Sequence, residues 1–258
     1  MVAVVATTGE SDEVHTATFV DEDLRGARFV RTDLSDAVMR GVDVDGADID
    51  APWLLGGGSL RVNGVDVVPF VEAELNRRFP GRADRSAGDP EGLRGAWASL
   101  EETWAATLRR VAAMPSGTVD VSVHGEWSFA QTLRHLVMAT DTWLGRAIQE
   151  RDKPYHPIGQ PNVEYETDGR DMSIFTRVTP SYAEVLEVRA GRVAMVRDFL
   201  AGVTVDELAT PRKNPHNGES GETTLSCLHT ILEAEWEHHI YAVRDLDTID
   251  SGLTVQAG

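Results

Sequence analysis

A strict period of five residues runs along the N-terminal part of the chain, from Ala17 to Ala51. The central position of each pentad is apolar, and the position two residues before it mostly holds a small residue. The central residues are Phe19, Leu24, Phe29, Leu34, Met39, Val44 and Ile49. Because helices repeat every ~3.6 residues and strands every ~2, neither ordinary element explains this period. The segment therefore needs a fold whose structural unit is five residues long.

This pattern resembles the pentapeptide-repeat family, in which a right-handed square coil points a large apolar residue and a small one inward on each side. The resemblance implies a short N-terminal β-solenoid over residues 17–51. Four pentads close one turn in that architecture, so seven pentads, the number counted here, make just under two coils. Since so short a stack cannot easily bury its own faces, we expect a packing or dimerisation module, with a homodimer as one outcome. Residues 1–16 are polar and aperiodic, which predicts a flexible tail.

Residues 52–88 are predicted to form a linker that contains a β-hairpin. Three consecutive glycines, Gly56 to Gly58, mark a flexible turn near its start. The segment 60–68 then alternates around Asn63-Gly64, a dipeptide typical of tight hairpin turns. A short helix is expected over residues 71–79.

From residue 89 onward the apolar period becomes helical, in four segments at 89–113, 128–149, 180–202 and 223–246. Ser128 with Gln131, and Ser181 with Glu184, have the spacing of capping boxes at two of the starts. We therefore predict a mainly α protein with an up-down four-helix bundle over residues 89–250, followed by a tail at 251–258. The connection 151–179 is long for a bundle, which is typical of lids and binding loops.

Composition limits the partners. The formal charge of −18 disfavours nucleic acid and anionic membranes, because phosphates would be repelled. The single cysteine, Cys227, excludes an intramolecular disulfide and fits a reducing cytosol. No signal-like N-terminus and no apolar run of membrane-spanning length is visible. The sequence thus predicts a cytoplasmic protein that binds neither nucleic acid nor a membrane.

Glu235 and His239 lie four residues apart, in the middle of the apolar arc of the fourth helical segment. A carboxylate and an imidazole in a core are costly unless something compensates them, and a bound metal ion would do so. The third ligand candidate is His135 in the second helical segment. Its neighbours on the same side include Thr132 and Ala139, whose small side chains leave room for an ion and a ligand.

The residues around these positions resemble the DinB superfamily, which includes thiol-dependent transferases and mycothiol-dependent maleylpyruvate isomerases. The resemblance rests on the segments 127–135 and 235–246 and covers about residues 89–248. It implies a metal triad of His135, Glu235 and His239 and a small-molecule substrate. Many relatives have His at the second position, whereas the isomerase branch has Glu there, as this chain does.

Two imidazoles and one carboxylate with open positions suit a divalent ion, with Zn²⁺ as the first choice and Ni²⁺ or Fe²⁺ as alternatives. We therefore predict a metal-dependent transferase that activates a low-molecular-weight thiol, such as mycothiol, as a metal-bound thiolate. No general base is assigned. A metal-dependent hydrolase and a non-catalytic interaction protein that uses its pentads remain alternatives. His238 lies at the edge of the apolar arc and is predicted to be solvated or to support a metal ligand. It is also the alternative to one of the three named ligands. Cys227 is predicted to be a core residue.

Overall fold

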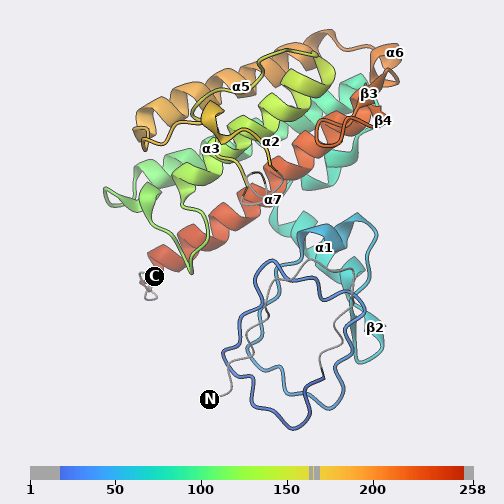
Figure 1. The fold of residues 1–258 in the computed structure, drawn as a ribbon, viewed down its shortest axis with the longest axis vertical. Coiled ribbons are helices and arrows are strands. Elements are labelled where there is room, and N and C mark those ends of the chain that lie inside the picture. The colour runs from blue at the N-terminus through green and yellow to red at the C-terminus, as the bar shows by residue number, and fades with distance from the viewer. Residues whose placement is uncertain (1–17, 163–164, 166–168, 253–258) are drawn as a thin grey trace. The chain divides into compact units, whose positions relative to one another are not determined.

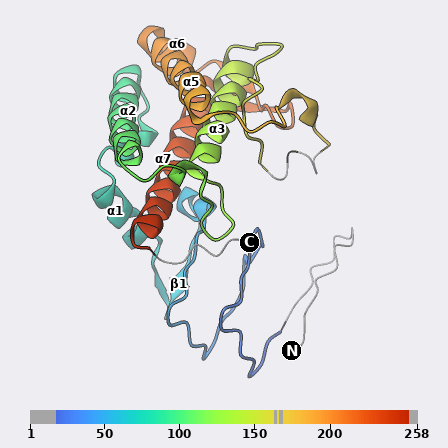
Figure 2. The ribbon, with the colours of Figure 1, turned by 90° about the vertical axis from the view of Figure 1, so that its left-hand side faces the viewer.

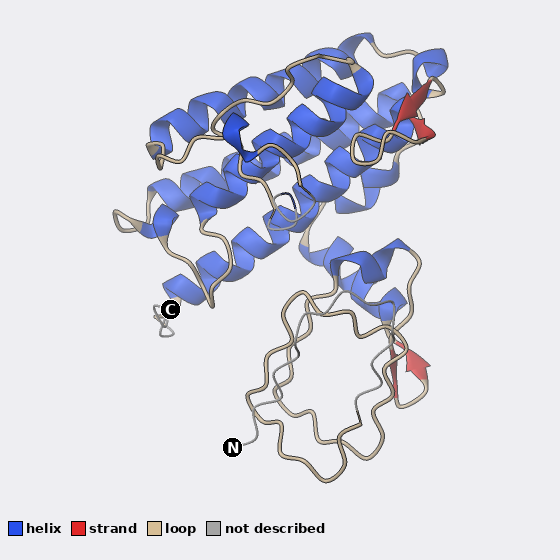
Figure 3. Cartoon of the chain, in the orientation of Figure 1, coloured by secondary structure: helices blue, strands red, loops and turns tan. Residues whose placement is uncertain are grey.

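The computed structural model describes residues 18–162, 165 and 169–252. The predicted tail at 1–16 lies outside these residues, as does the predicted tail at 251–258 apart from its first two residues. The chain divides into two compact units, residues 1–49 and residues 50–258. Most of the second unit is helical (Figure 3). The prediction of a mainly α protein is therefore confirmed.

The first unit contains turns but no helix or strand among its described residues. A residue with positive φ recurs every five positions, at Asp21, Gly26, Arg31, Asp36, Gly41 and Gly46. In alternate pentads a backbone hydrogen bond closes the turn, as from Ala27 N to Leu24 O at 2.9 Å. The backbone therefore bends with the period of the sequence and winds in an open coil (Figure 1).

The apolar central residues of the pentads are exposed: Leu24 is the least exposed, at 45%, and Ile49 the most exposed, at 60%. The predicted β-solenoid is therefore not seen in residues 18–49, which have no strands and no covered interior. The physical reason is length: in a repeat protein each unit is covered by its neighbours, and fewer than two coils leave no inner unit.

The second unit begins with a short 3₁₀ helix η1 (Pro52–Gly56), the strands β1 (Arg61–Val62) and β2 (Val65–Asp66), and helix α1 (Val68–Arg78). The strands pair antiparallel, Arg61 with Asp66 and Val62 with Val65, so the predicted hairpin is confirmed. Asn63 and Gly64 both have positive φ, 50° and 83°, as a two-residue type I′ turn requires. The 3₁₀ helix η2 (Arg82–Ser86) follows.

Four long helices then pack side by side (Figures 1 and 2). They are α2 (Pro90–Ala112), α3 (Phe129–Thr140), α5 (Tyr182–Gly202) and α7 (Thr224–Asp250). Helices α2 and α3 each contact both α5 and α7. The capping boxes at Ser128 and Ser181 are both formed, and Thr223 makes a third with Ser226. Sequence thus located all four helices, and their shared interior is lined with aliphatic and tryptophan side chains.

The α-helix predicted over residues 128–149 is shorter in the structure, because α3 ends at Thr140. At Asp141 it changes to a π-helix, η4 (Asp141–Ile148), which contacts α7. The wider turn starts at a carboxylate that is only 1% exposed and is held by three donors from outside the helix. π-Helical turns are rare and are frequent at functional sites.

The remaining elements are short. They are the 3₁₀ helices η3 (Thr118–Asp120) and η5 (Met172–Ile174), helix α6 (Val205–Leu208), and an antiparallel pair of strands, β3 (Pro211–Lys213) and β4 (Ser220–Thr223). Sequence analysis missed the β3–β4 pair because neither strand carries an apolar alternation. In the part of the chain that the structure describes, no helix combines the length and apolar character needed to cross a membrane.

Candidate metal centre

Glu235 and His239 lie on the buried stripe of α7, as their spacing predicted. Their exposed fractions are 1% and 3%. The rest of the stripe is apolar and includes Leu228, Leu232 and Leu246. Both polar groups therefore need compensation inside the bundle, which Glu235 finds at both oxygens and His239 finds at one ring nitrogen.

Arg189 of α5 compensates Glu235. Its Nη2 donates to both carboxylate oxygens of Glu235, at 2.6 Å and 2.5 Å, and Arg189 is itself only 5% exposed. Burial raises the pKa of Glu235, while the charge and hydrogen bonds of Arg189 act in the opposite direction. Arg189 was not among the predicted site residues, although a signal was present: it lies on the buried stripe of α5 with Val185, Val196 and Leu200. A basic residue on such a stripe indicates a buried carboxylate partner.

His239 lies in an aromatic enclosure. Its ring meets Trp104 edge to face, with centroids 4.9 Å apart, and Phe79 at 5.8 Å in the same manner. Its Nε2 is 2.8 Å from the Thr107 hydroxyl oxygen of α2, and its Nδ1 is buried with no partner among the described residues. Burial lowers the pKa of His239 to about 4, so the ring is neutral at pH 7.

His135 lies elsewhere, stacked on His238. The two ring centroids are 4.7 Å apart and the planes are inclined by 26°. Trp127 packs against both rings, at 4.6 Å from His135 and 6.2 Å from His238. Helices α3 and α7 thus each contribute one imidazole to a pair covered by an indole.

The hydrogen bonds of the pair fix its tautomers. Nδ1 of His135 is 3.0 Å from the carbonyl oxygen of Gln160, and Nδ1 of His238 is 2.7 Å from that of Ala234. Because a carbonyl oxygen only accepts, each Nδ1 must carry the proton, and each Nε2 then bears a lone pair. Burial, and next the neighbouring His238, lower the pKa of His135 to about 3. Burial likewise lowers the pKa of His238. Both lone pairs are therefore available at neutral pH.

The predicted triad is not assembled in the structure. Among the described residues, no three His, Cys, Asp or Glu side chains stand close enough together to hold a metal ion. Arg189 donates to both oxygens of Glu235, and His135 is stacked on His238. Nε2 of His239 bonds the Thr107 hydroxyl, while its Nδ1 has no partner among the described residues. The triad itself stays a prediction, and the histidine that lies beside His135 is His238, the alternative ligand of the sequence analysis.

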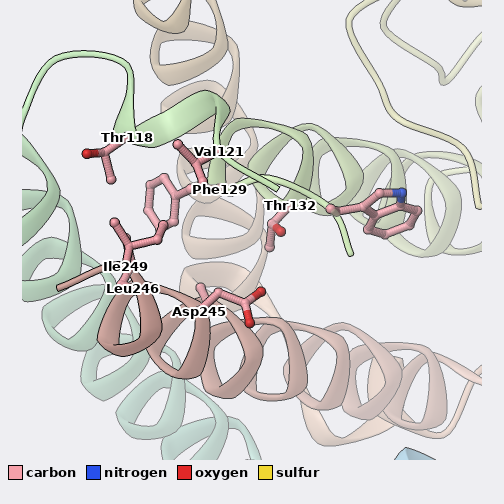
Figure 4. A pocket seen from close by; sticks show the side chains of 9 residues that line it. Thr118, Val121, Phe129, Thr132, Asp245, Leu246 and Ile249 are labelled. Atoms are coloured by element: carbon pink, nitrogen blue, oxygen red, sulfur yellow. The ribbon is translucent and has the colours of Figure 1, made fainter. Parts of the chain in front are cut away.

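Two of the cavities among the described residues of the second unit bear on a candidate site. The smaller one, with a volume of about 10 Å³, is lined by Trp127, Thr132, Asp245 and neighbouring apolar residues. Figure 4 shows Thr132 of α3 and the carboxylate of Asp245 of α7 on its two sides. This space suits a single water molecule. The smaller cavity lies beside the histidine pair, because Trp127 lines this cavity and also packs on both rings.

The larger cavity, of about 580 Å³, is lined by Arg146, Arg151, Asp152, Lys153, Pro154, Tyr155 and Ile174. Its volume falls in the usual range for small-molecule sites, about 300–1,000 Å³. Three of its seven lining residues are cationic in a chain of net charge −18. The binding of an anionic ligand is therefore more favourable in this cavity than at most of the protein surface.

The buried imidazole of His239 predicts a loss of stability in acid. Its folded-state pKa of about 4 is below the ordinary value of 6.5, so the unfolded chain binds the proton first as pH falls. Stability contributed by the neutral ring is present above pH 6.5 and is lost towards pH 4. Between pH 7 and pH 5 we expect the wild type to lose about 2 kcal/mol more free energy of unfolding than His239→Gln. Denaturant titrations at both pH values, with metal chelated, measure this; equal losses in the two proteins would contradict it.

Comparisons with known proteins agree with the two-part organisation. The family model described as the DinB superfamily matches residues 99–242. Pentapeptide repeats, in 8 copies, match residues 23–50. No curated protein and no solved structure matches the chain significantly. The first match spans more than half of the 258 residues and includes all the histidines and carboxylates of the candidate centre.

Proposed function

Because this chain belongs to the DinB superfamily, a family of DinB-like metal-dependent enzymes, we propose that it is a transferase that activates a low-molecular-weight thiol on a divalent metal ion. We propose His135 and His238 as the two protein ligands, each binding through Nε2. The observation that carries this choice is that backbone carbonyls hold both Nδ1–H groups, at 3.0 Å and 2.7 Å. Metal-binding histidines almost always have such a partner on the other ring nitrogen.

The residues fit a divalent ion in donor type and protonation state. Two neutral imidazole nitrogens suit Zn²⁺, Ni²⁺ and Fe²⁺ and leave several positions open for exogenous ligands. When bound, the metal would supply Lewis acidity that lowers the pKa of a coordinated thiol. The part played by this chain is to present two lone pairs and, through Trp127, to cover one side of the pair with an apolar ring.

The thiol has to come from outside the protein. The only cysteine, Cys227, is 0% exposed on α7, and burial raises the pKa of its thiol to about 11. Such a group is a poor nucleophile at neutral pH. This supports a thiol cosubstrate over a cysteine nucleophile of the protein, and agrees with the sequence-based assignment of Cys227 to the core.

We expect the Co²⁺-substituted protein to bind a thiol directly. Addition of mycothiol, glutathione or N-acetylcysteine should produce a thiolate-to-cobalt charge-transfer band in the near-ultraviolet, because the metal binds the deprotonated sulfur. The corresponding alcohols, such as N-acetylserine, should produce none. A protein that binds Co²⁺ but shows no band with any of the three thiols would contradict the thiol role and favour the activation of water.

A further inference from the structure

Hydrogen bonds at the two ends of the segment 156–160 connect the histidine pair to the ion pair of Asp141 and Arg192. The end nearest the pair is the carbonyl of Gln160, which accepts from Nδ1 of His135 at 3.0 Å. The same segment is fixed to α3 next to this point: Arg134 Nε donates to Ile158 O at 2.8 Å, and Gln160 N donates to Arg134 O at 3.1 Å. The position of one carbonyl thus depends on how this segment is held.

The other end of the network is Asp141, the first residue of the π-helix η4. Arg192 of α5 donates to both of its oxygens, from Nε at 2.9 Å and from Nη2 at 3.1 Å. The backbone N–H of His156 donates to the second oxygen at 2.8 Å. Since Asp141 is only 1% exposed, its charge depends on these donors. The buried carboxylate therefore anchors the segment by its main chain.

Between the two ends the chain makes a tight turn. Gly159 N donates to His156 O at 3.0 Å, and Ile158 N donates to His156 Nδ1 at 3.2 Å. A Cβ on Gly159 would lie 3.2 Å from His156 O and 3.3 Å from Met138 Cβ. With a third contact of 3.1 Å to Phe175 Cε1, a Cβ here would push the turn and its neighbours apart by a few tenths of an ångström. Displacement at His156 or at Gly159 would therefore be transmitted to Gln160.

We propose that Asp141 and Arg192 are positioning residues for the metal ligand His135. By anchoring His156 they hold the Gln160 carbonyl against Nδ1 of His135 and so keep its Nε2 free of a proton. This inference rests on the proposed function for its significance, but its structural content is testable without metal. A group that hydrogen-bonds a metal-binding histidine typically changes metal affinity by 10- to 100-fold when removed, and Asp141 and Arg192 act through such a group, the Gln160 carbonyl.

The test combines ¹⁵N NMR of the histidine rings in the metal-free protein with zinc titration against a chromophoric chelator. In the wild type, His135 should be in the Nδ1–H tautomer. Asp141→Asn keeps the shape of the side chain but loses acceptor capacity and charge, and should give a mixture of the two tautomers and about tenfold weaker zinc binding. Gly159→Ala should do the same with the ion pair intact. A merely structural role would lower stability without changing the tautomer.

Arg197→Gln is the matched control, because Arg197 also lies on α5 and pairs with a carboxylate, Glu101, but at the surface. It should change neither measurement. The proposal is overturned if Asp141→Asn and Gly159→Ala keep the wild-type tautomer of His135. If Asp141→Asn does not fold, Gly159→Ala decides alone. A wild type that binds no zinc would refute the proposed function, whereas the tautomer would still decide the role of Asp141.

Discussion

Replacing His135 or His238 by Ala is expected to abolish stoichiometric metal binding. Each imidazole supplies one of the two proposed donor atoms, and loss of a ligand should exceed the ~100-fold effect of losing a supporting residue. Glu235→Gln and His239→Gln should retain the metal, because Arg189 bonds both oxygens of Glu235 and His239 offers only a buried Nδ1 inside its aromatic enclosure. Elemental analysis after anaerobic reconstitution, together with a chelator competition for affinity, measures all four variants.

The same four variants separate the two ligand assignments. If Glu235→Gln and His239→Gln lose the metal while His238→Ala keeps it, the triad predicted from sequence is the site, and the interior must rearrange on binding. If the wild type takes up less than about a tenth of an equivalent of any transition metal, no metal enzyme of this kind exists here. Circular dichroism of each variant serves as the folding control.

The ligand question shows where sequence reasoning reaches its limit. Helical periodicity placed Glu235 and His239 on the buried stripe of α7, and both are buried. Periodicity gives the direction of a side chain about its own helix axis, but not which neighbouring helix it meets. Glu235 meets α5 and His239 meets α2, whereas His238, at the edge of the stripe, meets α3. Pairing across helices depends on rotation and crossing angle, which a helical projection does not contain.

The same limit explains the other differences. The four helices and the Asn63-Gly64 hairpin follow from local signals, namely caps, apolar periods and a turn dipeptide. The π-helix at Asp141 has no such signal, because its carboxylate is satisfied by Arg192 and by the backbone of His156, far along the chain. The carbonyl of Gln160 that fixes the tautomer of His135 is a backbone group, so the residue type at this position does not indicate the hydrogen bond.

The buried ion pair between Arg189 and Glu235 is expected to be the most costly single interaction to break in the bundle. Arg189→Met leaves the carboxylate of Glu235 without its donor at 1% exposure. Breaking one side of a buried pair typically costs about 3–5 kcal/mol of unfolding free energy, whereas replacing both partners by apolar groups is often close to neutral. The double variant Arg189→Met/Glu235→Leu should therefore be more stable than Arg189→Met alone. Denaturant unfolding of the metal-free proteins measures the complete double-mutant cycle.

Arg197→Gln provides the surface comparison, since the Arg197–Glu101 pair has its arginine side chain 55% exposed and exposed pairs contribute about 1 kcal/mol or less. If Arg189→Met costs no more than Arg197→Gln, water reaches Glu235 and the carboxylate is open to other ligands. That result would restore Glu235 as a metal ligand candidate, because the argument against it is that Arg189 occupies both of its oxygens. A large cost with a stable double variant would instead assign Glu235 to the architecture of the bundle and leave metal binding to the histidine pair.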